Sequence, residues 1–224
     1  MTPERFSRLR RVLDRRQPDL TVLLDNVHKP HNFSAILRSC DAVGVLEAHA
    51  VWGETGLRPS KLTSGGAAKW VGIRTHRDVR AAVAALRGAG FRLVAAHPGE
   101  NARDYREIDY TAPTAVMLGA ELRGLGEAAL ESADSRVCVP MMGMVASLNV
   151  SVAAAAILLE AQRQRSDAGM YARSRLDRTL YAKILFEWTQ PEIARHCRRH
   201  GLPYPPLDED GEMVGPLPAP GRSG

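Results

Sequence analysis

The feature that most constrains the fold of this chain is an alternating pattern. Over most of its length, short apolar stretches alternate with longer amphipathic or alanine-rich stretches. The short stretches predict buried strands at Leu20–Leu24, Ala48–Trp52, Val71–Thr75, Phe91–Ala96, Ala115–Leu118 and Arg136–Val139. The longer stretches predict helices at Asn32–Val43, with Gly44 in the stopping position, at Val79–Arg87 and at Leu148–Arg165. Strands that alternate with helices favour an α/β fold, in which a parallel sheet has helices on both faces.

The two ends of the chain follow a different pattern. Residues 3–16 predict an amphipathic helix capped by Thr2, and Asp177–Trp188 and Pro191–His200 predict two further helices rich in arginine and aromatic residues. Residues 53–69 are rich in glycine, serine and lysine and predict a mobile loop. We therefore expect a basic helical extension at 1–18, the α/β domain at 19–168, a helical extension at 169–206 and a disordered tail at 207–224.

Positive charge is concentrated at the two ends. The net charge is +5, and the first sixteen residues alone contain six arginines. A further arginine-rich stretch runs from Arg163 to Arg199, whereas the middle of the chain is more balanced. Basic ends around a balanced middle favour extensions that hold RNA, although the charge by itself is equally compatible with a solvated surface.

The cysteines and the apolar stretches limit the location of the protein. Cys40, Cys138 and Cys197 are far apart and form no C-x-x-C pair, which favours reduced thiols in a cytoplasmic protein. The longest apolar stretch, Val150–Leu159, is too short to span a bilayer, and the N-terminus has no apolar signal core. We expect no membrane partner.

Two common nucleotide-binding motifs are missing. The first predicted strand leads into Asp25-Asn26-Val27-His28 instead of a G-x-G-x-x-G fingerprint, which disfavours a nicotinamide-dependent enzyme. Gly119 and Gly124 have the spacing of a phosphate-binding loop, but Leu125 stands where that loop needs lysine. Histidines occur in pairs at 28 and 31 and at 196 and 200, yet no second ligand pair supports either, so we expect no metal.

Three segments fit none of these motifs. They are Asn32–Arg38 at the start of a predicted helix, Val116–Leu125 where a strand enters a glycine-rich turn, and Val139–Val150 where an apolar loop enters a helix. Together, and in this order, they resemble the three motifs of the SPOUT-class RNA ribose 2′-O-methyltransferases. The stretches Arg15–Thr21, Val27–Asn32 and Ala161–Arg165 narrow the resemblance to the tRNA guanosine-18 members of that class (TrmH type), and it covers about the first 205 residues.

The resemblance implies a fold and an activity. The fold would be the SPOUT domain, whose C-terminal part forms a deep trefoil knot, in a homodimer with the site near the subunit interface. The activity would be methylation of the ribose 2′-hydroxyl of guanosine 18 in the D-loop of tRNA, with S-adenosylmethionine as the methyl donor. Two alternatives stay open: the same chemistry on another tRNA nucleotide or on ribosomal RNA, and a non-catalytic RNA-binding protein.

The matched motif positions imply catalytic roles. Arg38 would hold the phosphate next to the target ribose and stabilise negative charge on its oxygen, a role that suits a guanidinium better than proton removal does. Asn32 would orient Arg38 or cap its helix. Glu121 would order its loop by pairing with arginine or with backbone amides. Ser147 and Asn149 would cap the following helix or contact substrate.

The same resemblance implies the binding residues. The cofactor would be held by Ala96, Leu118, Gly119, Val139, Met141 and Leu148, with Gly119 letting the backbone approach it closely. Ordinary core packing is the alternative for these residues. Ala120 and Ala146 stand where members of the class often have a longer polar side chain. The tRNA backbone would be held by Arg8, Arg11, Arg15, Arg16, Arg163, Arg165, Arg173, Arg195, Arg198 and Arg199. For Arg163 and Arg165, complementing the helix dipole is the alternative.

Overall fold

The computed structural model describes residues 1–52, 66–99, 101–121 and 123–217, without the side chain of Ala67. The contacts divide the chain into two compact units. The sheet unit is Gln17–Tyr171, and the terminal unit combines Met1–Arg16 with Ala172–Gly224. The two ends of the chain therefore belong to the same unit. Most of the predicted mobile loop, residues 53–65, lies outside the described residues, and its last four residues form a 3₁₀ turn, η1 (Gly66–Lys69).

The sheet unit contains a parallel sheet with the strand order β3-β2-β1-β6-β4-β7-β5. The strands are β1 (Leu20–Asp25), β2 (Glu47–Val51), β3 (Gly72–His76), β4 (Arg92–Ala96), β5 (Arg103–Asp104), β6 (Thr114–Gly119) and β7 (Ser135–Cys138). The central strands β1 and β6 pair over their whole length and are buried throughout. Apolar side chains that point to both faces explain their continuous apolar sequences, and the predicted parallel sheet is confirmed.

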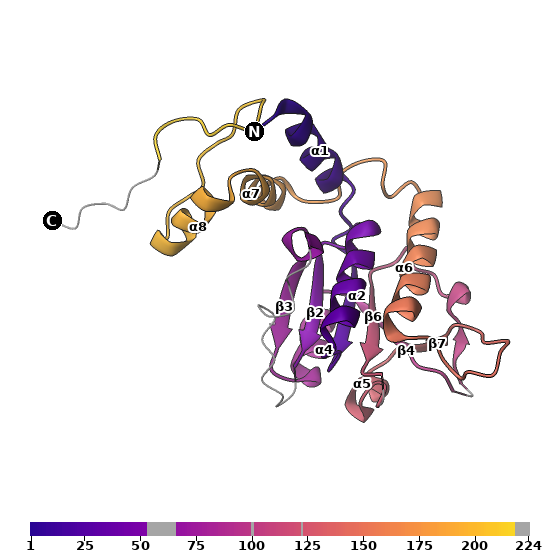
Figure 1. The fold of residues 1–224 in the computed structure, drawn as a ribbon. Helices are drawn as coiled ribbons and strands as arrows, with labels where there is room; N and C mark the ends of the chain where they lie inside the picture. Colours follow the sequence, from indigo (N-terminus) through magenta and orange to yellow (C-terminus); the bar gives the residue numbers. More distant parts are fainter. Residues whose placement is uncertain (53–65, 100, 122, 218–224) are drawn as a thin grey trace. The chain divides into compact units, whose positions relative to one another are not determined.

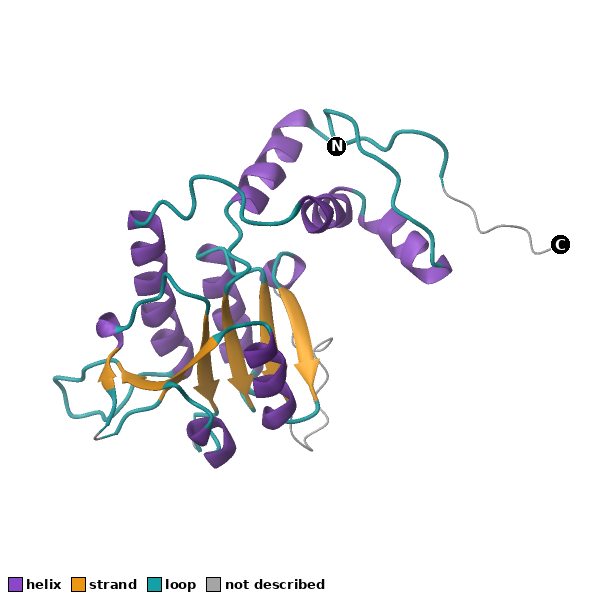
Figure 2. Cartoon of the chain, turned by 180° about the vertical axis from the view of Figure 1, so that it is seen from behind, coloured by secondary structure: helices purple, strands orange, loops and turns teal. Residues whose placement is uncertain are grey.

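Helices cover both faces of the sheet (Figures 1 and 2). On one face, α2 (Pro30–Ala42) and α6 (Val150–Asp167) contribute to one apolar core, with Phe33 and Ile157 among its buried side chains. On the other face, α4 (Val79–Gly88) and α5 (Glu127–Glu131) contribute to a second core around Leu86. Both predicted layers are confirmed.

The helix boundaries follow from local residues. Asp78 caps α4 by accepting a hydrogen bond from the amide of Ala81 at 2.7 Å. Proline occupies the first turn of α2, and Gly44, with a φ of 83°, follows its end. Because α2 begins at Pro30, Asn32 lies inside the helix and does not cap it, so that alternative for Asn32 is wrong. Helix α5, strand β5 and the 3₁₀ turn η2 (Tyr105–Glu107) were not predicted, since they are too short to show a periodicity.

The terminal unit is built from α1 (Pro3–Asp14), α7 (Arg178–Thr189) and α8 (Pro191–His200). Phe6, Leu9 and Leu13 form the buried face of α1, which confirms the predicted amphipathic helix, and Thr2 caps the helix. The segment after α8 packs on the same unit: Leu207 bridges to Met213, and the N-terminal ammonium pairs with Glu212. The prediction of a disordered tail is therefore wrong for residues 207–217, while 218–224 lie outside the described residues. The trefoil knot stays a prediction.

Candidate active site

A cavity in the sheet unit lies at the carboxyl ends of β4, β6 and β7. Its volume is ≈ 470 Å³, within the range of roughly 300–1,000 Å³ that is typical of small-molecule sites. It is lined by the ends of β4, β6 and β7, by the turn that follows β6, and by the first turns of α6. Parallel sheets generally bind their ligands at this edge. The lining residues are Ala96, His97, Pro98, Leu118, Gly119, Ala120, Glu121, Arg123, Gly124, Val137, Cys138, Val139, Ala146, Ser147, Leu148, Asn149, Val150, Ala153 and Ile157.

A tight turn after β6 shapes one wall of the cavity. The amide of Gly124 donates to the carbonyl of Ala120 at 2.7 Å, and Gly124 has a φ of 65°. A Cβ atom at Gly119 would lie 2.0 Å from the carbonyl carbon of Gly124. The chain thus needs glycine at 119 because its own backbone folds back there. The expectation that Gly119 is required for close approach of a cofactor receives no support from this geometry.

A buried carboxylate anchors the same turn. The Asp25 side chain, at the end of β1, accepts hydrogen bonds from the amide of Gly126 at 3.0 Å and from Asn26 Nδ2 at 2.7 Å. Asn26 itself has a φ of 56°. Asp25 was not among the predicted site residues. A carboxylate at the end of an otherwise apolar strand was the signal that could have identified it.

The three motif segments meet at the Glu121 carboxylate. Glu121 accepts hydrogen bonds from Asn32 on α2 and from Asn149 Nδ2, the latter at 2.8 Å, and it forms an ion pair with Lys29. Asn149 also lies 3.3 Å from Asn32 Oδ1. Glu121 lies at the centre of this junction, but its partners are a lysine and two asparagines, not the arginine or backbone amides that we expected.

Asn149 also caps α6. Its Oδ1 accepts hydrogen bonds from the amide of Ser151 at 2.8 Å and from the Ser151 hydroxyl at 2.6 Å. One asparagine therefore fixes the start of α6 and joins it to Glu121. Ser147 is exposed and lines the cavity two residues earlier, outside the capping interaction.

Three of the predicted catalytic and cofactor-binding residues do not line the cavity: Arg38, Asn32 and Met141. Arg38 is an exposed residue of α2, six positions after Asn32, which places it roughly 120° away around the helix axis. Asn32 is bonded to Glu121 and Asn149, so the structure gives no support to a role in orienting Arg38. Met141 is half-buried and also does not line the cavity. The other predicted cofactor residues, Ala96, Leu118, Gly119, Val139 and Leu148, all line it.

Two of the predicted RNA-binding arginines are fully buried. Arg165 is 0% exposed and bonds to Asp19 Oδ1 at 2.6 Å, to Gln17 Oε1 at 3.0 Å and to the carbonyl oxygen of Tyr110 at 2.8 Å. Arg16 is also 0% exposed, with its guanidinium 5.3 Å from the ring centre of Trp188. The prediction that Arg16 and Arg165 contact phosphate is wrong, because neither guanidinium reaches the surface.

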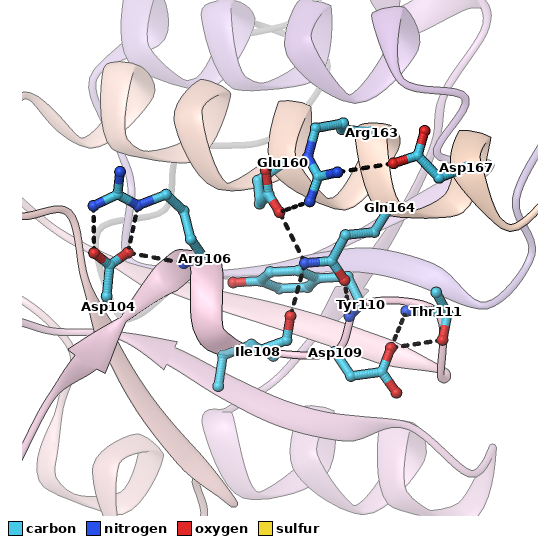
Figure 3. A network of polar contacts seen from close by, with 10 residues as sticks. All are labelled: Asp104, Arg106, Ile108, Asp109, Tyr110, Thr111, Glu160, Arg163, Gln164 and Asp167. Atoms are coloured by element: carbon cyan, nitrogen blue, oxygen red, sulfur yellow. Dashed lines mark hydrogen bonds and ion pairs between the residues drawn. The ribbon is translucent and has the colours of Figure 1, made fainter.

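The remaining predicted arginines are exposed. They are Arg8, Arg11, Arg15, Arg163, Arg173, Arg195, Arg198 and Arg199. Some already have acidic partners: Figure 3 shows Arg163 between Glu160 and Asp167. The two ion pairs are each 2.8 Å long. Arg198 lies 3.0 Å from Glu187 in the same way.

Two further observations concern ligands and membranes. In the described ranges, no group of three or more histidine, cysteine, aspartate or glutamate side chains could hold a metal ion. No helix within the described residues combines the length and apolar character that crossing a membrane requires.

Comparisons with known proteins agree with this geometry. Residues 19–159 match the model of the SpoU rRNA methylase family, and residues 163–216 match its C-terminal region. A tRNA (guanosine(18)-2′-O)-methyltransferase from Thermus thermophilus is 59% identical over 187 residues, which cover 84% of this chain and 96% of the relative.

Solved structures are similar as well. A TrmH/SpoU tRNA-modifying enzyme from A. aeolicus matches with a TM-score of 0.75 and 43% identity, over 83% of this chain and 94% of that chain. The SpoU methyltransferase AviRb from Streptomyces viridochromogenes, in complex with the cofactor AdoMet, matches with a TM-score of 0.58 and 32% identity, over 68% of this chain and 59% of that chain. The sheet, the cavity and these similarities together show that the chain belongs to the SpoU rRNA methylase family.

Proposed function

We propose that the protein methylates the ribose 2′-hydroxyl of guanosine 18 in tRNA, with S-adenosylmethionine as methyl donor. The observation that carries this proposal is the hydrogen-bonded junction of Asn32, Glu121 and Asn149, which brings the three motif segments together beside one cavity. The relative from Thermus thermophilus has this activity in its name and aligns over nearly its whole length.

The cavity fits S-adenosylmethionine in size and chemistry. Leu118, Val139 and Leu148 offer apolar walls for an adenine ring, while the turn after β6 adds backbone and charged polar groups. Ala96 and Gly119 complete the set that would hold the cofactor. When bound, the cofactor would supply its sulfonium methyl group to the ribose oxygen and leave as S-adenosylhomocysteine, and the hydroxyl proton would pass to water.

The residues of the chain would contribute mainly by positioning and by electrostatics. The Glu121 junction fixes the loops on either side of the cavity, so that a methyl group and a ribose oxygen can be held in line. Ser147, exposed at the cavity, is available to the substrate. We assign Arg38 the stabilisation of negative charge on the ribose oxygen. Since Arg38 lies outside the cavity of its own chain, it must approach the ribose from the RNA side or from a second subunit.

A homodimer belongs to this proposal. Met142 and Met144, on the loop before α6, are 96% and 103% exposed, and Val152 and Leu159 expose apolar side chains on α6 itself. Large exposed apolar side chains often mark a contact surface, so these four are suited to contact with a second copy. Sedimentation equilibrium should give twice the mass of the 24.5 kDa chain, and a monomer at micromolar concentration would contradict this part of the proposal.

The terminal unit would hold the tRNA backbone. Its exposed predicted arginines include Arg8, Arg11 and Arg15 at the N-terminal end and Arg173 and Arg199 in the C-terminal part. The proposed location is the cytoplasm, a compartment that contains tRNA.

The direct test is methyl transfer from labelled S-adenosylmethionine to a tRNA transcript, followed by mapping of the modified nucleotide. A matched transcript with 2′-deoxyguanosine at position 18 lacks the accepting hydroxyl and should receive no label. Label at another tRNA nucleotide, or on ribosomal RNA alone, would support the alternative substrates. Failure to bind S-adenosylmethionine in calorimetry would favour a non-catalytic RNA-binding protein.

A further inference from the structure

Charged side chains are scarce in the lining of the cavity. Among its lining residues, Glu121 is the acidic side chain and Arg123 is the guanidinium, and His97 is the titratable ring beside them. Glu121 and Arg123 come from the same turn, two residues apart. One turn therefore brings two opposite charges to a cavity whose other walls are mostly apolar.

The two charges have different surroundings. Glu121 is engaged by Lys29, Asn32 and Asn149, so its oxygens are already occupied by donors of the chain itself. Arg123 is exposed, and within the described part of the chain it forms no hydrogen bond or ion pair. A guanidinium with its donors available at the edge of a cavity is suited to bind a carboxylate through two parallel hydrogen bonds.

Contacts of the turn hold the backbone of Arg123 in place. The Ala120–Gly124 bridge closes the turn, and the Asp25 carboxylate holds the amide of Gly126 immediately after it. A Cβ atom built on Gly124 would lie 3.7 Å from His97 Nδ1, which places the turn against the loop after β4. Arg123 is thus anchored between two cavity walls and does not belong to a long surface loop.

We propose that Arg123 binds the carboxylate at the methionine end of S-adenosylmethionine and so makes the cavity selective for nucleosides that carry an amino-acid tail. This proposal rests on the proposed function, because S-adenosylmethionine is the ligand that the proposed function assumes. The carboxylate is the anionic group of that ligand, and the Glu121 carboxylate would repel it. The apolar walls suit the adenine ring. The charged turn that contains Arg123 is therefore the part of the lining that suits the amino-acid end of the ligand.

Calorimetry with two probes tests this inference. S-adenosylhomocysteine contains the carboxylate, whereas 5′-methylthioadenosine has the same nucleoside and thioether without the amino-acid tail. Arg123→Met should raise the Kd of S-adenosylhomocysteine about tenfold and change the Kd of 5′-methylthioadenosine less than about twofold, since a charge-assisted hydrogen bond is lost only with the first probe. Arg123→Lys, which keeps the charge without the planar fork, should recover part of the loss.

Arg77→Met is the matched control, because Arg77 is strongly exposed and lies outside the cavity. It should leave both affinities unchanged. If Arg123→Met lowers the affinity for both probes equally, or lowers the affinity for neither, the proposed role of Arg123 is overturned while the proposed function stays intact. If Arg123→Met raises only the KM for tRNA, the proposal is also overturned, and Arg123 would then be a residue that contacts the RNA. If the unaltered chain binds neither probe, the proposed function itself fails.

Discussion

Arg163 and Arg165 lie two residues apart on α6, in very different surroundings. Arg163 points into solvent between Glu160 and Asp167, while Arg165 is enclosed and bonds to Asp19, Gln17 and backbone carbonyls. A guanidinium can be buried only when the surrounding acceptors replace the hydrogen bonds that it made to water. Removing it leaves those acceptors buried without a donor.

Arg165→Met should therefore lower the free energy of unfolding by about 3–5 kcal/mol, and Arg163→Met by less than about 1 kcal/mol, because exposed ion pairs contribute little. Denaturant unfolding of the two variants measures the difference. If both variants lose a similar, small amount of unfolding free energy, the hydrogen bonds of Arg165 do not stabilise the fold. If Arg163 contacts tRNA, its variant should bind tRNA more weakly at unchanged stability.

Arg38 is the residue to which we assign the chemical step. Arg38→Ala should reduce single-turnover methyl transfer by at least about 100-fold, the usual cost of losing one preorganised charged donor in a transition state. It should leave the affinity for S-adenosylhomocysteine within about twofold, because Arg38 does not line the cavity. Single-turnover assays and calorimetry measure the two quantities. Equal losses of transfer and of cofactor affinity would contradict the assignment.

At the scale of elements, strands β2 and β3 hold a histidine pair. His49 is 6% exposed, and its Nδ1 lies 2.9 Å from Nε2 of His76, with Glu47 and Arg74 beside the pair. Burial, followed by the nearby charges of His76 and Arg74, lowers the pKa of His49 from 6.5 to about 4. Burial also lowers the pKa of His76. Both imidazoles therefore stay neutral in the folded chain near neutral pH.

This pair should make stability depend on pH. The unfolded chain protonates His49 near pH 6.5 but the folded chain only near pH 4, so stability should fall as the pH drops through this window and level off below it. The loss from His49 is at most about 3 kcal/mol. His49→Asn should flatten the dependence between pH 6.5 and 4, as measured by denaturant unfolding at each pH. The exposed His31→Asn variant is the matched control, and an unchanged pH dependence in His49→Asn would refute the prediction.

At the scale of the whole molecule, burial reduces the set of arginines that can meet RNA. With Arg16 and Arg165 excluded, the exposed arginines of the terminal unit and Arg163 remain. Arg195 and Arg198 are paired with Glu192 and Glu187, whose carboxylates partly offset their positive charge. The effective positive surface is therefore smaller than the composition suggests.

Binding to tRNA should weaken steeply as the salt concentration rises, because each phosphate contact releases a counterion. Arg11→Ala should lower the slope of log Kd against log salt by a little under one, as expected for the loss of one contact. Filter binding over a series of salt concentrations measures the slope. Arg103→Ala, an exposed arginine outside the proposed RNA-binding set, is the control. An identical slope in Arg11→Ala would remove Arg11 from the interface.

The sequence predicted the architecture well for a physical reason. Strands such as β1 and β6 are buried on both faces, so their continuous apolar runs are visible without any knowledge of their neighbours. The cap at Thr2 and the stop at Gly44 depend on adjacent residues alone. Five-residue α5 and two-residue β5 escaped prediction because they cover little more than one period of such a pattern, too few residues for a repeat to show.

By itself, then, the sequence determined the alternation of strands and helices, the two covered faces of the sheet and the three segments that mark the candidate site. Only the tertiary structure decided that Asn32 binds Glu121 and Asn149, the latter 117 residues away, and that Arg165 is buried against Asp19, 146 residues away. Helix and strand periods arise from neighbouring residues, whereas the surroundings of a polar side chain are set by whatever distant segment packs against it. An arginine on the surface and an arginine in the core look identical until that packing is known.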